Sequence, residues 1–96
     1  MKEADRIGRA VIAARLAACV NIVRGVGSIF CWKGKVEKAR EFLLILKTTA
    51  DNFSALEKKI KRLHSYEVPE IIALPVAAGS AEYLRWVSAS VRNPKA

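Results

Sequence analysis

Apolar residues recur at intervals of three and four positions in three stretches of the chain, which is the spacing of one face of an α-helix. The first stretch spans residues 3–17, the second spans residues 51–63, and the third follows Gly79 and Ser80. The apolar faces of the three predicted helices are, in order, Ala4, Ile7, Ala10, Val11 and Ala14; Phe53, Leu56, Ile60 and Leu63; and Tyr83, Leu84, Val87 and Val91. We therefore expect three amphipathic helices.

Runs of β-branched and other apolar residues between these helices predict three strands. The first occupies residues 19–36, with a bend or β-bulge expected at its glycines, Gly25 and Gly27. Polar residues 37–40 predict the turn, and the nearly continuous apolar run 42–48 predicts a return strand that is buried on both faces. Residues 71–77 predict a last strand at a sheet edge or bulge, because Pro75 cannot donate a main-chain hydrogen bond.

The resulting order of helix, strand, strand, helix, strand and helix indicates an α+β sandwich, with helices on one face of an antiparallel sheet. One further strand in front would complete the β-α-β-β-α-β pattern of the ferredoxin-like fold. Met1 and Lys2 do not supply that strand. We expect residues 1–96 to form a single domain, because this length suits one small core.

The composition adds an expectation of self-association. The chain is 52% hydrophobic but only 7% aromatic, and a small domain with more apolar surface than it can bury often forms oligomers. The longest apolar runs are too short to cross a bilayer and no leader-like segment opens the sequence, which favours a cytoplasmic protein. Cys19 and Cys31 match neither a disulfide framework nor a metal-binding spacing, which favours small core or strand residues.

The formal net charge of +8 raises the possibility of nucleic-acid binding. The basic residues are nevertheless distributed over at least three predicted elements, with no block of five or six like charges. No run of aromatic residues beside Lys or Arg of the RNA-recognition type is present. A solvated basic surface is therefore the simpler interpretation, and a basic RNA-binding module stays open as an alternative.

Residues 64–70 gather an imidazole, a phenol and two carboxylates at the junction between the second helix and the last strand. Pro69 favours an extended backbone at the residue before it, so the helix is expected to have ended there. A ligand or a second subunit can reach polar groups at such a junction. Residues 64–70 are therefore the leading candidate for a functional site.

Five phrases, in the same order and with similar gaps, resemble one family. They are residues 15–21, 28–35, 46–49, 64–69 and 83–86. Together they are similar to the CutA family of divalent-cation tolerance proteins, in register from about residue 3 to residue 92. The resemblance implies a ferredoxin-like fold, a tight homotrimer with sheets joined edge to edge, a link to copper and other divalent ions, and no established enzymatic reaction.

The chain departs from that family pattern in the residues associated with copper. The apolar strand that family members carry before the first helix is absent from this sequence, and with it a cysteine associated with copper. The family's His-Pro-Tyr is here His64-Ser65-Tyr66, and Leu63 occupies the preceding position, where the family also has histidine. Only His64 therefore carries over from the family's metal ligands.

The candidate site residues fall into two groups. The metal ligands we predict are His64, with Glu67 and Glu70 as supporting donors for Cu(II) or another divalent cation that the fold itself does not require. Favourable interaction with the helix dipole is the structural alternative for His64, and subunit contact is the alternative for both glutamates. The predicted interface or pocket residues are Trp32, Lys47, Tyr66, Tyr83 and Trp86, for which ordinary core or interface packing is the alternative.

The sequence thus predicts a non-enzymatic homotrimer that responds to divalent metal ions, copper among them. It contains no nucleophile motif, no second histidine and no glycine-rich phosphate loop. The alternatives are a trimeric regulatory scaffold that binds a small anion near Lys47 between subunits, and the basic RNA-binding module.

Overall fold

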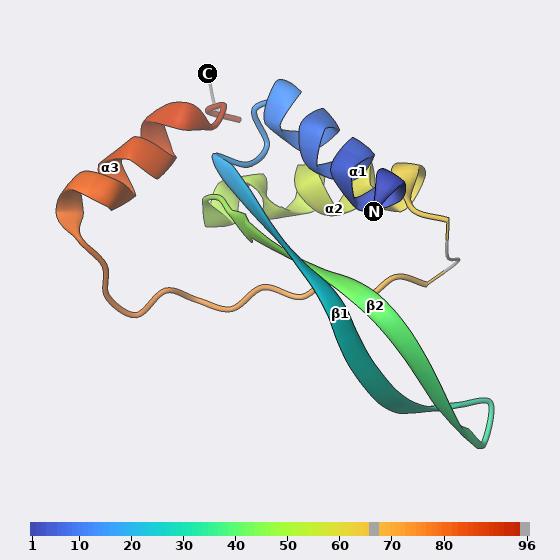
Figure 1. Ribbon diagram of the computed structural model, residues 1–96. Helices are drawn as coiled ribbons and strands as arrows, with labels where there is room; N and C mark the ends of the chain where they lie inside the picture. Colours follow the sequence, from blue (N-terminus) through green and yellow to red (C-terminus); the bar gives the residue numbers. More distant parts are fainter. Residues whose placement is uncertain (66–67, 95–96) are drawn as a thin grey trace.

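The computed structural model describes residues 1–65 and 68–94, in which a helix is followed by two strands, a short 3-10 helix and two further helices (Figure 1). The three predicted helices and the first two predicted strands are confirmed, with their ends shifted by several residues. The elements are α1 (Lys2–Ala13), β1 (Cys19–Trp32), β2 (Lys35–Lys47), the short 3-10 helix η1 (Ala50–Asn52), α2 (Phe53–Leu63) and α3 (Ala81–Ser90).

Strands β1 and β2 form one long antiparallel hairpin, paired from Cys19 with Lys47 to Trp32 with Lys35. The register shifts between Val23 and Val26, so the β-bulge predicted from the glycines is confirmed. Gly25 takes a φ of +66° at this point, a conformation that glycine adopts without steric cost. The bulge divides the hairpin into a base beside the helices and a tip that projects away from them (Figure 1).

The predicted turn at residues 37–40 is wrong. The chain reverses at Lys33 and Gly34, whose φ angles are +50° and +79°. Two consecutive positive φ values are typical of the two-residue type I′ turn, whose twist matches that of the flanking strands. The polar residues 37–40 instead belong to β2, where most of them are exposed in the projecting half of the hairpin.

Strand β2 is also covered on one face only, contrary to the predicted burial on both faces. Leu44 and Leu46 pack against the hydrophobic core, whereas Leu43 and Ile45 are 47% and 45% exposed. Successive side chains of a strand point to opposite faces, and the described helices cover only the face that carries Leu44 and Leu46.

Residues 71–77 do not form the predicted strand. The described sheet has two strands, β1 and β2, and residues 71–80 follow as an extended connection that leads to α3 (Figure 1). Among the described residues, no main-chain group of residues 70–79 is hydrogen bonded to another main-chain group. An extended segment becomes a strand only when a neighbouring strand pairs with it, and no described strand lies in pairing position.

The hydrophobic core lies between α1, α2 and the base of the hairpin. Its buried members are Ile7, Val11, Leu16, Ala17, Leu56 and Ile60. These residues come from the apolar faces predicted for the first two helices and from the loop after α1. Helices α1 and α2 lie together at the base of the hairpin (Figure 1), so the helices expected on one face of the sheet are confirmed for this pair.

Candidate functional site

His64 stands at the end of α2, where the chain leaves the helix for an extended conformation (φ −82°, ψ 143°). Its main-chain N–H still donates to the carbonyl of Ile60 at 2.8 Å. The residue is half-buried. The structure therefore places the imidazole at the end of the second helix, as predicted from the sequence, and leaves it partly accessible to a ligand.

The beginning of α1 lies against this junction and contributes a carboxylate that the sequence analysis missed. The main-chain N–H of Ser65 donates to Glu3 Oε2 at 3.0 Å, and Arg6 Nη2 donates to the carbonyl of Leu63 at 3.1 Å. Glu3 and Arg6 are separated from residues 63–65 by most of the chain. An acidic residue in the first turn of a helix was the only available signal, and it fits dipole stabilisation equally well.

The electrostatics of this corner favour the charged form of Glu3. Its pKa is lowered from the ordinary value of 4.5, first by a hydrogen bond from the Ser65 side chain. The main-chain hydrogen bond from Ser65 and the attraction of His64 and Arg6 act in the same direction, while desolvation opposes them. Glu3 is therefore an anionic neighbour of His64, and its carboxylate oxygens are of a type that binds divalent cations.

The other predicted metal ligands are not brought to His64 in the described part of the chain. Glu67 lies outside the described residues, as does Tyr66, which was predicted as an interface or pocket residue, and Glu70 is exposed. Within residues 1–65 and 68–94, no three His, Cys, Asp or Glu side chains form a group that could hold a metal ion. One imidazole and one neighbouring carboxylate are too few donors for tight binding of Cu(II) or Zn(II), so the described donors of one chain do not fit such an ion by themselves.

Lys47 lies at the base of the hairpin, away from the tip. Its Nζ is 3.8 Å from the Sγ of Cys19, its register partner on β1. No ion pair joins Lys47 to an acidic residue among the described contacts. Within the described part of the chain, no carboxylate therefore neutralises this half-buried ammonium group.

The predicted aromatic residues occupy two separate regions of the chain. Trp32 ends β1 at the hairpin tip, where it is 51% exposed and Lys33 Nζ lies 5.9 Å from its ring centroid. Tyr83 and Trp86 contact each other on α3 with a centroid distance of 5.6 Å. The tip and α3 lie at opposite ends of the molecule (Figure 1), so a pocket containing all three rings would require more than one copy of the chain.

Comparison with known proteins identifies the family. The sequence model of one protein family, described as the CutA1 divalent ion tolerance protein, matches residues 1–90 of the chain. The chain belongs to the CutA1 family. The resemblance inferred from the five sequence phrases is thereby confirmed.

CutA proteins from distant organisms are similar to this chain in sequence. The divalent-cation tolerance protein CutA of Thermus thermophilus is 51% identical over 84 residues, which are 88% of this chain and 82% of that protein. The mouse protein CutA is 48% identical over 86 residues, 90% of this chain and 49% of that protein. The chain thus spans about half the length of the mouse relative.

Solved CutA structures share the fold. The CutA1 structure from Thermus thermophilus superposes with a TM-score of 0.93 at 47% identity, covering 95% of this chain and 88% of that chain. CutA1 from Oryza sativa superposes with a TM-score of 0.92 at 43% identity, covering 96% and 84%. The α+β arrangement of the described residues is therefore that of solved CutA structures.

None of the helices in residues 1–65 and 68–94 is both long enough and apolar enough to cross a membrane.

Proposed function

We propose that this chain is a non-enzymatic divalent-metal tolerance and response protein of the CutA type, which works as a homotrimer of ferredoxin-like subunits. Membership of the CutA1 divalent ion tolerance family is the observation that carries this proposal. The Thermus thermophilus relative is named a divalent-cation tolerance protein, and Cu(II) or another divalent cation is the ligand that we expect.

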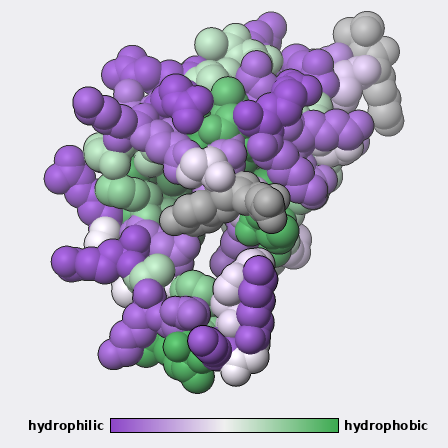
Figure 2. Space-filling view, turned by 90° about the vertical axis from the view of Figure 1, so that its right-hand side faces the viewer, coloured by the Kyte–Doolittle hydropathy of each residue, from purple (hydrophilic) through white to green (hydrophobic). Residues whose placement is uncertain are grey.

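Exposed apolar surface supports the trimer. Several large apolar side chains of the hairpin and of residues 71–77 are at least 69% exposed: Ile29, Val36, Ile72, Leu74 and Val76. Figure 2 shows a strongly hydrophobic patch at the projecting end of the molecule, surrounded by hydrophilic side chains. Monomeric proteins rarely leave extended apolar surfaces in water, and cyclic homo-oligomers are a common way to cover them.

Native mass spectrometry of the purified chain tests the assembly. A mass of three chains is the expected result, and it should persist on dilution to micromolar concentration. A stable, folded single chain under these conditions would contradict the trimer. The same outcome would revive the basic RNA-binding module, whose binding to single-stranded RNA should weaken steeply with salt.

For the metal, we propose that His64 contacts the divalent ion, with Glu67 and Glu70 as supporting donors and with further donors from a second subunit. Imidazole and carboxylate are suitable ligands for Cu(II) and Zn(II). The half-buried position of His64 beside the anionic Glu3 supports this role. Donors from a second subunit are included in the proposal because the described residues of one chain, which do not include Glu67, provide no group of three donors.

Isothermal titration calorimetry with Cu(II) and Zn(II) tests this site in the wild-type chain and in His64→Gln. The expected result is loss of most of the binding heat in His64→Gln, with smaller losses in Glu67→Gln and Glu70→Gln. Glu82→Gln on the exposed first turn of α3 is the matched control and should bind as the wild type does. Equal heats for the wild type and His64→Gln would exclude His64 from the site.

Lys47 supports a second candidate function, a trimeric regulatory scaffold that binds a small anion between subunits. The specific observation is its half-buried ammonium group, which has no acidic partner among the described contacts. The test is the extent to which an amine-reactive reagent acylates Lys47 in the presence and in the absence of phosphate. Reduced acylation of Lys47 in the presence of phosphate would support this scaffold. Equal acylation with and without phosphate would contradict it.

We also propose a cytoplasmic location. Two free thiols, Cys19 and Cys31, support it, because reducing compartments preserve unpaired cysteines. Relatives described as chloroplastic in Oryza sativa and periplasmic in Archaeoglobus fulgidus show that other compartments occur in the family. Cell fractionation followed by immunodetection is the direct test, and recovery outside the cytoplasmic fraction would contradict the proposal.

A further inference from the structure

Two reactive side chains, those of Cys19 and Lys47, meet at the base of the hairpin. Lys47 Nζ lies 3.8 Å from Cys19 Sγ, and the two residues are register partners on β1 and β2. The main-chain N–H of Ala18 donates to the carbonyl of Lys47 at 2.8 Å, so main-chain pairing continues beyond the pair. A thiol and an amine are thus held together by two hydrogen-bonded segments of main chain.

Both side chains of this pair can be reached by a small molecule, because they are half-buried and not enclosed. Their neighbours Val20 and Leu46 pack against the hydrophobic core, and successive side chains of a strand point to opposite faces. Cys19 and Lys47 therefore lie on the other face of the hairpin, where Ile45 is 45% exposed. The described helices leave this face uncovered.

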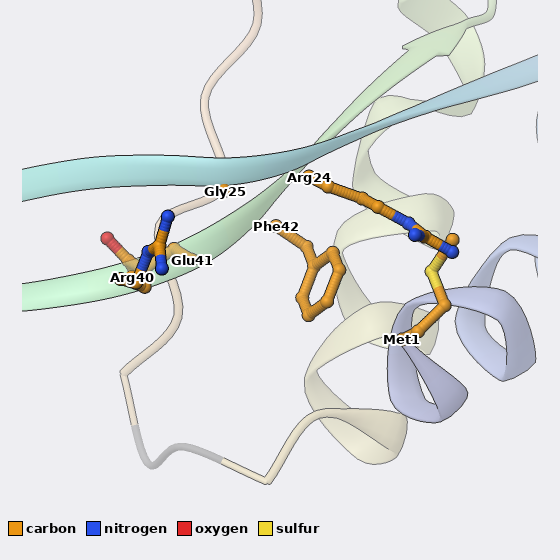
Figure 3. A pocket seen from close by; sticks show the side chains of 6 residues that line it. All are labelled: Met1, Arg24, Gly25, Arg40, Glu41 and Phe42. Carbon is orange, nitrogen blue, oxygen red and sulfur yellow. The ribbon is translucent and has the colours of Figure 1, made fainter.

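The hollow beside the β-bulge offers no comparable pair. Its lining residues are Met1, Arg24, Gly25, Arg40, Glu41 and Phe42, which include no cysteine and no lysine. Figure 3 shows the guanidinium groups of Arg24 and Arg40 on opposite sides of the Phe42 ring and pointing apart. The two arginines therefore do not converge on one ligand, whereas the thiol and the amine at the base of the hairpin lie within reach of one acyl group.

A cysteine beside a lysine can pass an acyl group to it. The thiolate is the nucleophilic form of cysteine, and it attacks the carbonyl carbon of an acyl thioester, which transfers the acyl group to the cysteine sulfur and releases the carrier as a thiol. A neutral amine close to the new thioester then attacks the same carbon. This second step is fast when the two groups are already held together, because no bimolecular encounter is needed.

We propose that Cys19 and Lys47 form an acyl-acceptor site for small acyl thioesters. The acyl carbon first becomes bonded to Cys19 Sγ, and the carrier leaves as a thiol. Lys47 Nζ releases one proton to water and attacks that carbon; the N–C bond forms, the S–C bond breaks, and a proton of the amine passes to the sulfur. The products are an amide at Lys47, which has lost its positive charge, and a regenerated Cys19 thiol. The contact lies within one chain, so this proposal is independent of the metal and anion functions proposed above.

Incubation of the full chain with acetyl coenzyme A in phosphate-free buffer, followed by peptide mass spectrometry, tests the proposal. Lys47 of the wild type should be acetylated about tenfold faster or more than Lys58, an exposed lysine of α2. Cys19→Ser should slow acetylation of Lys47 about tenfold or more, since the amine must then react by direct encounter. Lys47→Arg should retain the acetyl group on Cys19, as a thioester that hydroxylamine removes.

Cys31→Ser is the matched control. Cys31 is an exposed free thiol whose register partner, Val36, carries no amine. Acetylation of Lys47 should therefore proceed in Cys31→Ser at the wild-type rate. The N-hydroxysuccinimide ester of acetic acid attacks amines directly and should label Lys47 equally in the wild type and in Cys19→Ser. Circular dichroism of each variant verifies that the fold is retained.

Three results would overturn the proposal. The first is acetylation of wild-type Lys47 by acetyl coenzyme A no faster than that of Lys58. The second is a wild-type rate at Lys47 in Cys19→Ser, or absence of a thioester on Cys19 in Lys47→Arg. The third is slower labelling of Lys47 by the active ester in Cys19→Ser, because a change in the exposure of Lys47 would then explain the loss.

Discussion

Asn52 and Arg92 are hydrogen bonded to each other through both the nitrogen and the oxygen of the asparagine side-chain amide. Asn52 Nδ2 donates to the carbonyl oxygen of Arg92 at 2.9 Å, and Arg92 Nε donates to Asn52 Oδ1 at 3.3 Å. Asn52 is fully buried, and the main-chain N–H of Arg92 donates to the carbonyl of Arg15 at 2.8 Å. These bonds attach the chain after α3 to the start of α2 and to the loop after α1.

Asn52→Ala should lower the free energy of unfolding by about 2 kcal/mol or more, because it leaves buried hydrogen-bonding groups without partners. Urea denaturation followed by circular dichroism measures the change. Ser54→Ala, at an exposed position two residues further along the chain, is the control and should remain within about 0.5 kcal/mol of the wild type. Equal stability of the two variants would show that the hydrogen bonds of Asn52 make no net contribution to the free energy of unfolding.

The type I′ turn predicts opposite effects at its two residues. Lys33→Asn should stabilise the chain by about 0.5 kcal/mol, because asparagine tolerates positive φ better than lysine does. Gly34→Val should destabilise it by about 1–2 kcal/mol, because a β-branched residue is strained at positive φ. Thermal unfolding measures both changes. Gly27→Ala, which meets no atom within 4 Å and has no positive φ, should have a smaller effect than Gly34→Val.

The lowered pKa of Glu3 predicts a pH-dependent contribution to stability. A carboxyl whose pKa is lower in the folded state stabilises the fold above its unfolded pKa, near the ordinary value of 4.5, and loses this contribution as the pH falls through the folded pKa. Glu3→Gln should therefore be less stable than the wild type at pH 7, by under about 1 kcal/mol since the group is partly exposed. Below pH 4.5 the difference should shrink, as unfolding curves at a series of pH values would reveal. A constant difference across pH would contradict this origin.

The extended segment 71–77 predicts an interface. If its exposed apolar side chains pack against a second subunit, Leu74→Lys should reduce the trimer population, because it places a charge where apolar contact is expected. Native mass spectrometry at several concentrations measures this change. Lys58→Glu on α2 alters the charge of an exposed helix face and should leave the trimer intact. A trimer unaffected by Leu74→Lys would place residue 74 outside the subunit contacts.

The sequence predicted the elements whose signals are local. Leu56 and Ile60 of α2 recur at helical spacing and are both buried, and Gly25 marked the bulge that the hairpin contains. The turn at Lys33 and Gly34 was missed because lysine is an uncommon residue at positive φ and the polar run that follows resembled a loop. The metal prediction at His64, Glu67 and Glu70 stays untested.

Local spacing determined the three helices, the hairpin and the membership of the CutA1 family, since these depend on which residues follow one another. Tertiary structure alone decided which faces are covered, where Glu3 meets Ser65 and His64, and whether residues 71–77 find a pairing partner. The physical reason is that pairing and burial require a second surface from a distant part of the chain. The spacing of residues within one segment carries no information about that surface.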